Sequence, residues 1–177
     1  MVGSDWRLVR AMPNTAVTVR EGATVFCLGP GADTEDAKLV NTLFSCLGLC
    51  ARVQEAQIGP AKLLPHTLHT SHFADAVTGV SGSGPAYMYL IIEAMADEGV
   101  RQGLDRNTSY QLAAQTMVGA GRMVLASSTH PALLKDEVTS PGGSTAAAIR
   151  ALELGALRGT IMSAVAAAAE RCREINR

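Results

Sequence analysis

The feature that most constrains this fold is a change of pattern near Pro85, where strand-like runs give way to one predicted helix after another. A helix is predicted to run to about Glu98, because Ser83 can cap it and Pro85 suits its first turn. Its opening residues, 86–92, are apolar on every side, which is typical of a helix that is buried all round. Further helices are predicted over about 107–126, from Pro131, from Gly142–Gly143 to near Gly155, and over 157–175.

Residues 7–54 instead read as strand, strand, helix and strand, with β-branched runs at 17–20 and 24–28. Asp33 or Thr34 can cap a helix over 34–47, in which Leu39, Leu43 and Leu47 form one apolar stripe and Gly48 ends the helix. A last short strand is expected over 51–54. This order is typical of the end of an α/β sheet rather than of a complete domain.

The composition narrows the classes of protein. Hydrophobic residues make up 47% of the chain but aromatic residues only 4%, which favours closely packed helices over a β-sandwich. The net charge is −1, charged residues are 18%, and no basic run stands out, so nucleic acid is not an expected partner. A chain so poor in charge is expected to bury surface by forming a homo-oligomer.

The cellular location and the state of the cysteines are predicted from patterns that the sequence lacks. The four cysteines form no CxxC pair, which favours thiols in a reducing compartment over a zinc or redox site. No apolar run reaches the ~20 residues of a membrane span, and residues 1–10 contain no secretory apolar region. We therefore expect a soluble, intracellular protein with a cytoplasmic location, with mitochondrial association left open and no membrane partner.

Three motifs could carry chemistry. Ser140-Pro141-Gly142-Gly143-Ser144-Thr145 precedes a predicted helix, where backbone N–H groups can converge on a carboxylate or phosphate. On spacing alone, an ordinary capping turn is the simpler interpretation. The same holds for Gly79–Pro85, which opens a helix but is no GxGxxG fingerprint, and for Met12-Pro13-Asn14-Thr15 at a strand end. His66, His69 and His72 are interpreted as loop histidines, and no metal site is predicted.

In their fixed order, these motifs resemble the pyrroline-5-carboxylate reductase family, which makes proline with NADPH or NADH. The residues that carry the resemblance are Arg10–Thr15, Asp75–Tyr87 and Pro131–Glu153, with Val138–Thr145 the most specific. The resemblance implies a mostly α fold: an all-helical dimerisation domain preceded by a truncated α/β remnant of Rossmann type. It divides the chain into the remnant at 1–58, an atypical insertion or linker at 59–74, and the helical dimerisation and substrate-binding domain at 75–177.

The resemblance also implies the site. The cofactor would deliver hydride to the C=N carbon of 1-pyrroline-5-carboxylate, giving L-proline in the last step of its biosynthesis. Thr145 would be the catalytic residue, with its hydroxyl facing the ring nitrogen. The substrate-binding residues would be Val138, Ser140, Gly142, Gly143, Ser144 and Thr145, and the cofactor-binding residues would be Met12, Asn14 and Thr15. In this family's dimers, the sheet domain of one chain faces the helical domain of the other.

The chain departs from the family in two places. It has no GxGxxG loop for the dinucleotide phosphates, and some fifteen residues at 59–73 have no counterpart in the resemblance. We therefore expect no measurable reductase activity from the isolated chain. The alternative is a non-catalytic dimerisation module that pairs with full-length subunits. A 3-hydroxyacid dehydrogenase would want a catalytic lysine in the middle of a helix, and Lys38, Lys62 and Lys135 do not provide it.

Overall fold

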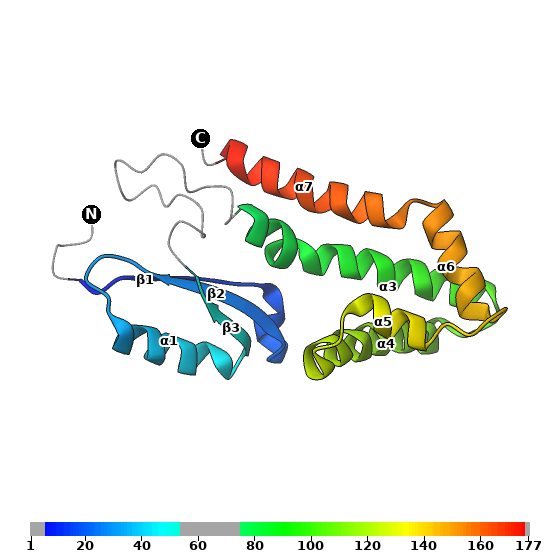
Figure 1. Cartoon of the computed structure of the whole chain (residues 1–177), viewed down its shortest axis with the longest axis horizontal. Helices are drawn as coiled ribbons and strands as arrows, with labels where there is room; N and C mark the ends of the chain where they lie inside the picture. Colours follow the sequence, from blue (N-terminus) through cyan, green and yellow to red (C-terminus); the bar gives the residue numbers. More distant parts are fainter. Residues whose placement is uncertain (1–5, 54–74, 176–177) are drawn as a thin grey trace. The chain divides into compact units, whose positions relative to one another are not determined.

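The computed structural model describes residues 6–53 and 75–175, and these form two compact units. One unit comprises Met1–Pro85 with Met162–Arg177, and the other comprises Ala86–Ile161. Figure 1 colours the elements along the chain. The expected division at residues 58 and 74 falls within the undescribed segment, as do the three histidines and the segment 59–73, so the domain division stays a prediction.

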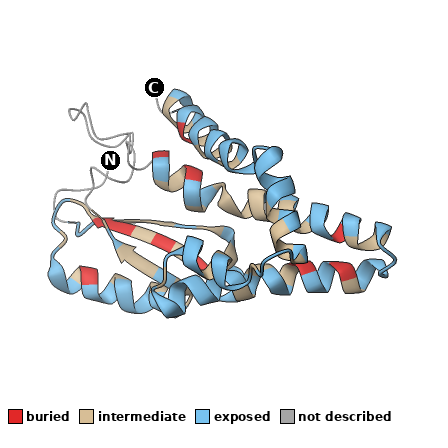
Figure 2. Ribbon diagram, turned by 45° about the vertical axis from the view of Figure 1, so that its right-hand side comes forward, coloured by how far each residue is buried: buried red, intermediate tan, exposed pale blue. Residues whose placement is uncertain are grey.

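The first unit is built on a three-stranded sheet in the order β1-β2-β3. The strands are β1 (Val9–Pro13), β2 (Gly22–Leu28) and β3 (Gly48–Arg52). β1 pairs with β2 antiparallel, with Val9 opposite Leu28, and β2 pairs with β3 parallel, with Gly22 opposite Gly48. Helix α1 (Thr34–Ser45) packs on this sheet (Figure 1). The central strand carries the buried residues Thr24, Phe26 and Cys27. Figure 2 shows red segments within the sheet.

Helix α1 begins where the sequence predicts and ends earlier. The Asp33 carboxylate accepts the N–H groups of Glu35 (2.8 Å) and Asp36 (3.1 Å), and the Asp36 side chain accepts the Asp33 N–H (3.0 Å), which is a capping box. Gly48 does not end the helix but begins β3 at φ +131°. A β-carbon there would overlap the Gly22 backbone, so strand pairing explains the glycine.

One further prediction for residues 6–53 is wrong. Residues 17–20 form no strand: Thr15–Val19 is the 3-10 helix η1, closed by bonds from the Arg20 N–H to the Val17 carbonyl (3.1 Å) and from the Thr18 hydroxyl to the Thr15 carbonyl (3.0 Å). These local bonds outweigh the β-branched side chains of the segment. In α1, Leu39 and Leu43 of the apolar stripe are exposed, and Ala37 is the buried residue.

The first unit also contains the π-helix η3 (Thr78–Gly82) and the C-terminal part of α7 (Leu157–Ile175). The Ser83 N–H donates to the Thr78 carbonyl at 2.8 Å, five residues back, and α3 (Gly84–Arg101) follows. Gly79 is buried against α7: a β-carbon there would lie 2.7 Å from the Val165 carbonyl oxygen. This glycine therefore allows close packing of the two helices.

The second unit contains α3 from Ala86 onward, α4 (Arg106–Ser127), α5 (Pro131–Glu137) and α6 (Ser144–Leu154). The Asp105 carboxylate caps α4 by accepting the Thr108 N–H at 3.0 Å, and the Asp97 carboxylate pairs with Arg106. The expectation that residues 86–92 are buried all round is wrong within this single chain, because Tyr89 and Leu90 are exposed. Few of the described helix residues are buried at all within this chain (Figure 2).

In the described residues, no single helix is both long and apolar enough to span a membrane. One pair, α6 and α7, meets that length and composition test only when taken together across a 51° bend.

Candidate active site

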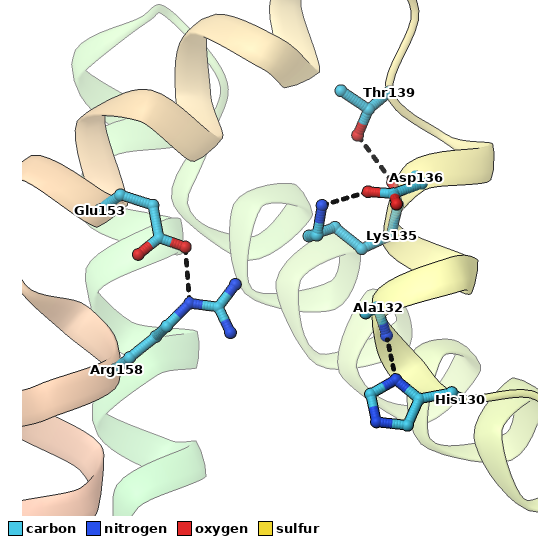
Figure 3. Close-up of polar contacts among 7 residues, drawn as sticks. All are labelled: His130, Ala132, Lys135, Asp136, Thr139, Glu153 and Arg158. Atoms are coloured by element: carbon cyan, nitrogen blue, oxygen red, sulfur yellow. Dashed lines mark hydrogen bonds and ion pairs between the residues drawn. The ribbon is translucent and has the colours of Figure 1, made fainter.

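Helix α5 leads into the predicted substrate-binding segment and is held at its start by a histidine. Pro131 occupies the first helical turn, and His130 Nδ1 accepts the Ala132 N–H at 3.2 Å (Figure 3). This bond uses one of the N–H groups that a helix start leaves without an internal acceptor. The order His130-Pro131 thus fixes where α5 begins.

The segment between α5 and α6 contains a tight turn. The Ser140 carbonyl accepts the Gly143 N–H at 3.0 Å, and Gly142 has φ +70°. Pro141 at the second position and a glycine with positive φ at the third position are the signature of a type II turn. The turn therefore accounts for the sequence Pro141-Gly142-Gly143: the first two residues suit its central positions, and the N–H of the third closes it.

Gly143 is the residue before α6 and has an extended backbone, with φ −76° and ψ 167°. It has no side chain to cap the helix, and the first turn of α6 contains no acidic residue. The N–H groups of Ser144, Thr145 and Ala146 therefore point out of the helix start without intrahelical acceptors. Such a start carries a partial positive charge and favours an anion.

The structure brings the six predicted substrate-binding residues together in this segment. Val138, Ser140, Gly142 and Ser144 are exposed, and Gly143 and Thr145 are half-buried. Thr145 occupies the second position of α6, and its hydroxyl has no hydrogen-bond partner within the described residues. Their role in binding substrate stays a prediction.

The predicted cofactor residues lie at the end of β1, in the other compact unit. Asn14 is fixed twice to Ala23: its N–H donates to the Ala23 carbonyl (3.2 Å), and its side-chain oxygen accepts the Ala23 N–H (3.1 Å). Met12 is half-buried, and its sulfur accepts the Thr78 hydroxyl at 3.8 Å. Thr15 is exposed at the start of η1. The contacts with Ala23 use the backbone N–H and the side-chain oxygen of Asn14. They leave the side-chain amide nitrogen of Asn14 available to donate.

The sequence does not predict the contacts of three residues on α5 or at its ends. His130 caps α5, Lys135 forms an ion pair with Asp136, and the Thr139 hydroxyl donates to a carbonyl group of α5 (Figure 3). The Thr139 N–H donates to a second carbonyl of this helix. The order His-Pro before a predicted helix could have indicated the first of them. Among the described residues, no group of three or more His, Cys, Asp or Glu side chains could hold a metal ion.

Comparison with known families decides the identity of this segment. The family model for pyrroline-5-carboxylate reductase dimerisation matches residues 71–175. The chain belongs to this family. The family resemblance predicted from the sequence is therefore confirmed, and so is the fold class of a mostly helical chain with a small α/β part before the helices.

Individual relatives agree with the family match. A pyrroline-5-carboxylate reductase of Arabidopsis thaliana is 47% identical over 174 residues, which are 98% of this chain and 57% of the relative. The Plasmodium falciparum pyrroline carboxylate reductase with NADP bound aligns at a TM-score of 0.81 and 36% identity, over 100% of this chain and 62% of that chain. A Coxiella burnetii pyrroline-5-carboxylate reductase aligns at 0.83 and 36%, over 99% and 59%. The chain spans about half the length of the curated relatives it matches.

Proposed function

We propose that this chain serves the NAD(P)H-dependent reduction of 1-pyrroline-5-carboxylate to L-proline, the activity of pyrroline-5-carboxylate reductases. The observation that carries the proposal is the turn from Ser140 to Gly143 before the uncapped start of α6, inside the segment that the family model matches. In this proposal the substrate is a small carboxylate, and the chain supplies its binding pocket. A cytoplasmic location stays a prediction.

The start of α6 would bind the substrate carboxylate. The N–H groups of Gly143, Ser144 and Thr145 are the donors, and the charge of the helix start favours an anion there. The Gly143 N–H is partly committed, because it already donates to the Ser140 carbonyl at 3.0 Å. We therefore assign the main carboxylate contacts to Ser144 and Thr145.

Thr145 would act on the ring. Its half-buried hydroxyl would donate to the ring nitrogen and hold the C=N bond in one orientation, while Val138 and Ser140 line the pocket. Reduction adds a hydride to the C=N carbon and a proton to the nitrogen. A donor placed at the nitrogen stabilises the charge that changes there during transfer.

The cofactor would be NADPH or NADH, which when bound supplies the hydride. Residues at the end of β1 fit a contact with one edge of the cofactor: the Asn14 side chain is held by Ala23 through its oxygen, which leaves its amide nitrogen to donate. Met12 and Thr15 would flank it. The 177 residues contain no GxGxxG motif for the cofactor phosphates.

A second copy of the chain is the proposed partner. Large apolar side chains are exposed on the helices of the second unit, among them Tyr89, Leu90, Leu112, Leu125 and Leu154. Exposed apolar side chains of this size support an interaction site on these helices. In the homodimer, the site would be shared between the sheet of one chain and the helices of the other. A monomer at micromolar concentration in sedimentation equilibrium would contradict this arrangement.

The match of residues 71–175 to a dimerisation family model supports a second candidate function, a dimerisation module that pairs with full-length subunits without catalysing reduction itself. Both candidates share the carboxylate pocket, and they differ in whether the chain takes part in turnover once it is paired with a full-length subunit. We expect the 177-residue chain to oxidise no NADPH in the presence of 1-pyrroline-5-carboxylate. Turnover above a protein-free blank would remove the second candidate.

The pocket is tested by comparing two ligands in calorimetric titrations of the chain. L-Proline carries the carboxylate, whereas pyrrolidine has the same ring without it. We expect the chain to bind L-proline at least about tenfold more tightly, as one or two charge-assisted hydrogen bonds provide. Equal affinity for the two ligands would contradict the proposed function.

A further inference from the structure

Thr139 lies between α5 and the turn, and it uses both of its donors on α5. Its hydroxyl donates to the Lys135 carbonyl at 2.6 Å (Figure 3), and its N–H donates to the Asp136 carbonyl at 3.0 Å. The last carbonyls of a helix have no partner within the helix, so these two bonds satisfy groups that would otherwise need water. The half-buried side chain thus joins the end of α5 to the segment that follows.

The next residue transmits this anchor to α6. Ser140 follows Thr139 directly, and its carbonyl accepts the Gly143 N–H at 3.0 Å. Gly143 in turn offers its own carbonyl to the Ala147 N–H at 3.3 Å, as the first bond of α6. A continuous series of backbone bonds therefore runs from α5 through Thr139 and Ser140 to the helix start.

The beginning of α5 is fixed as well. His130 Nδ1 accepts the Ala132 N–H at 3.2 Å, so this seven-residue helix is held at both ends. Of the two Thr139 bonds, the N–H bond is available to any residue except proline. The hydroxyl bond needs a serine or threonine at this position.

We propose that Thr139 is a positioning residue, which sets the orientation of the Ser140–Thr145 segment for the substrate carboxylate without touching the substrate. This inference rests on the proposed function, since it concerns the same pocket. The hydroxyl bond of Thr139 limits how far Ser140 can rotate relative to α5. The turn connects Ser140 to the N–H groups of Ser144 and Thr145, so their orientation depends on that of Ser140. Loss of the hydroxyl would loosen the pocket while leaving its residues in place.

The test compares Thr139→Val with a matched control. Thr160→Val removes the same kind of bond, from a hydroxyl to the carbonyl four residues back (Ala156, 3.2 Å), away from the turn. We expect Thr139→Val to raise the Kd for L-proline about tenfold, the scale of one well-made hydrogen bond, and Thr160→Val to leave it unchanged. The affinity for pyrrolidine should not change in either variant, and Thr139→Ser should bind L-proline as the wild type does.

A second pair keeps the test valid if valine at 139 prevents folding. Thr139→Ser and Thr139→Ala differ by the hydroxyl group, and we expect the same ratio of about ten in their L-proline Kd values. Wild-type affinity in both Thr139→Val and Thr139→Ala, with tight L-proline binding by the wild type, would overturn this inference alone. A wild-type chain that binds L-proline no better than pyrrolidine would overturn the proposed function and this inference together.

Discussion

The Ser140 hydroxyl occupies the place that a β-carbon on Gly143 would need, and the Ser140 carbonyl oxygen would lie 3.2 Å from such an atom. Gly143 has φ −76°, which any residue adopts, so a larger residue here meets the Ser140 side chain and causes no backbone strain. The hydroxyl is the far end of an exposed side chain and can move away. A substitution at Gly143 is therefore expected to displace the Ser140 side chain and to leave the fold unchanged.

The first prediction concerns Gly143→Ala. We expect the variant to fold with nearly wild-type thermal stability, because displacing one exposed hydroxyl costs little. L-Proline should bind several-fold more weakly, since Ser140 is pushed out of its position beside the helix start. Circular dichroism melting and calorimetric titration measure the two quantities. Wild-type affinity in this variant would mean that the Ser140 side chain does not line the pocket.

Gly142 gives the opposite prediction, because its φ of +70° is a conformation that L side chains rarely adopt. No heavy atom lies within 4 Å of a β-carbon built there, so the cost is one of backbone strain alone. Gly142→Ala should lower the free energy of unfolding by about 1–2 kcal/mol. Gly142→Asn should lose less, since asparagine tolerates this region. Equal losses in urea unfolding would argue against the positive φ.

Gly79 and Gly121 form a matched pair for helix packing. A β-carbon at Gly79 would lie 2.7 Å from the Val165 carbonyl oxygen, whereas nothing lies within 4 Å at Gly121 in α4. Gly79→Ala should destabilise the chain by about 1–3 kcal/mol through overpacking. Gly121→Ala should be neutral or stabilise α4 by up to about 1 kcal/mol, through its better helix propensity. Similar effects of the two substitutions would mean that α7 does not pack closely on η3.

Local chemistry explains what could be predicted from the sequence. Asp33 begins α1 because a carboxylate can accept the first helical N–H groups, a property that depends on neighbouring residues alone. The turn before α6 was predicted for a similar reason, since Pro141 and Gly142 favour its backbone angles whatever surrounds them. Family resemblance, rather than spacing, made this turn a candidate site.

Other features depend on what a segment meets in space. Residues 17–20 look like a strand by composition, yet local bonds such as the one from Arg20 to Val17 close η1. The roles of His130 and Thr139 rest on side chains that reach particular backbone groups, which no periodicity reveals. The exposed Leu39 and Leu43 show that an apolar stripe predicts an apolar helix face but not what that face packs against.

The ion pair of Asp75 and Arg173 provides a prediction about buried charge. The Asp75 side chain is 0% exposed, and the Arg173 Nε lies 3.7 Å from its carboxylate. Neither carboxylate oxygen accepts a hydrogen bond from the described residues. Arg173→Met should therefore cost about 3 kcal/mol, because it leaves a buried charge without its cation.

Arg171 is the matched control for that substitution. It pairs with Glu174 at 2.7 Å on the surface of the same helix, where solvent screens both charges. Arg171→Met should change the free energy of unfolding in urea very little. Losses of equal size in the two variants would show that the Asp75 pair is no stronger than a surface pair.

The last prediction concerns pH and Glu98 on α3. Hydrogen bonds from Arg101, at 2.6 and 2.7 Å, and from Gln102 lower the pKa of Glu98 from its ordinary 4.5 to about 2. A carboxyl whose pKa is lower in the folded than in the unfolded chain stabilises the fold above the unfolded value, and that contribution disappears as the pH falls through the folded value.

The melting temperature of the wild type relative to Glu98→Gln should therefore be constant above about pH 5 and decline between pH 4.5 and about 2. Because the group is exposed, added salt should shrink the difference at neutral pH. In an Arg101→Gln background the decline should become smaller, since the cation that contributes most to the shift is gone. A melting-temperature difference that grows on acidification would contradict a lowered pKa of Glu98 and its pairing with Arg101.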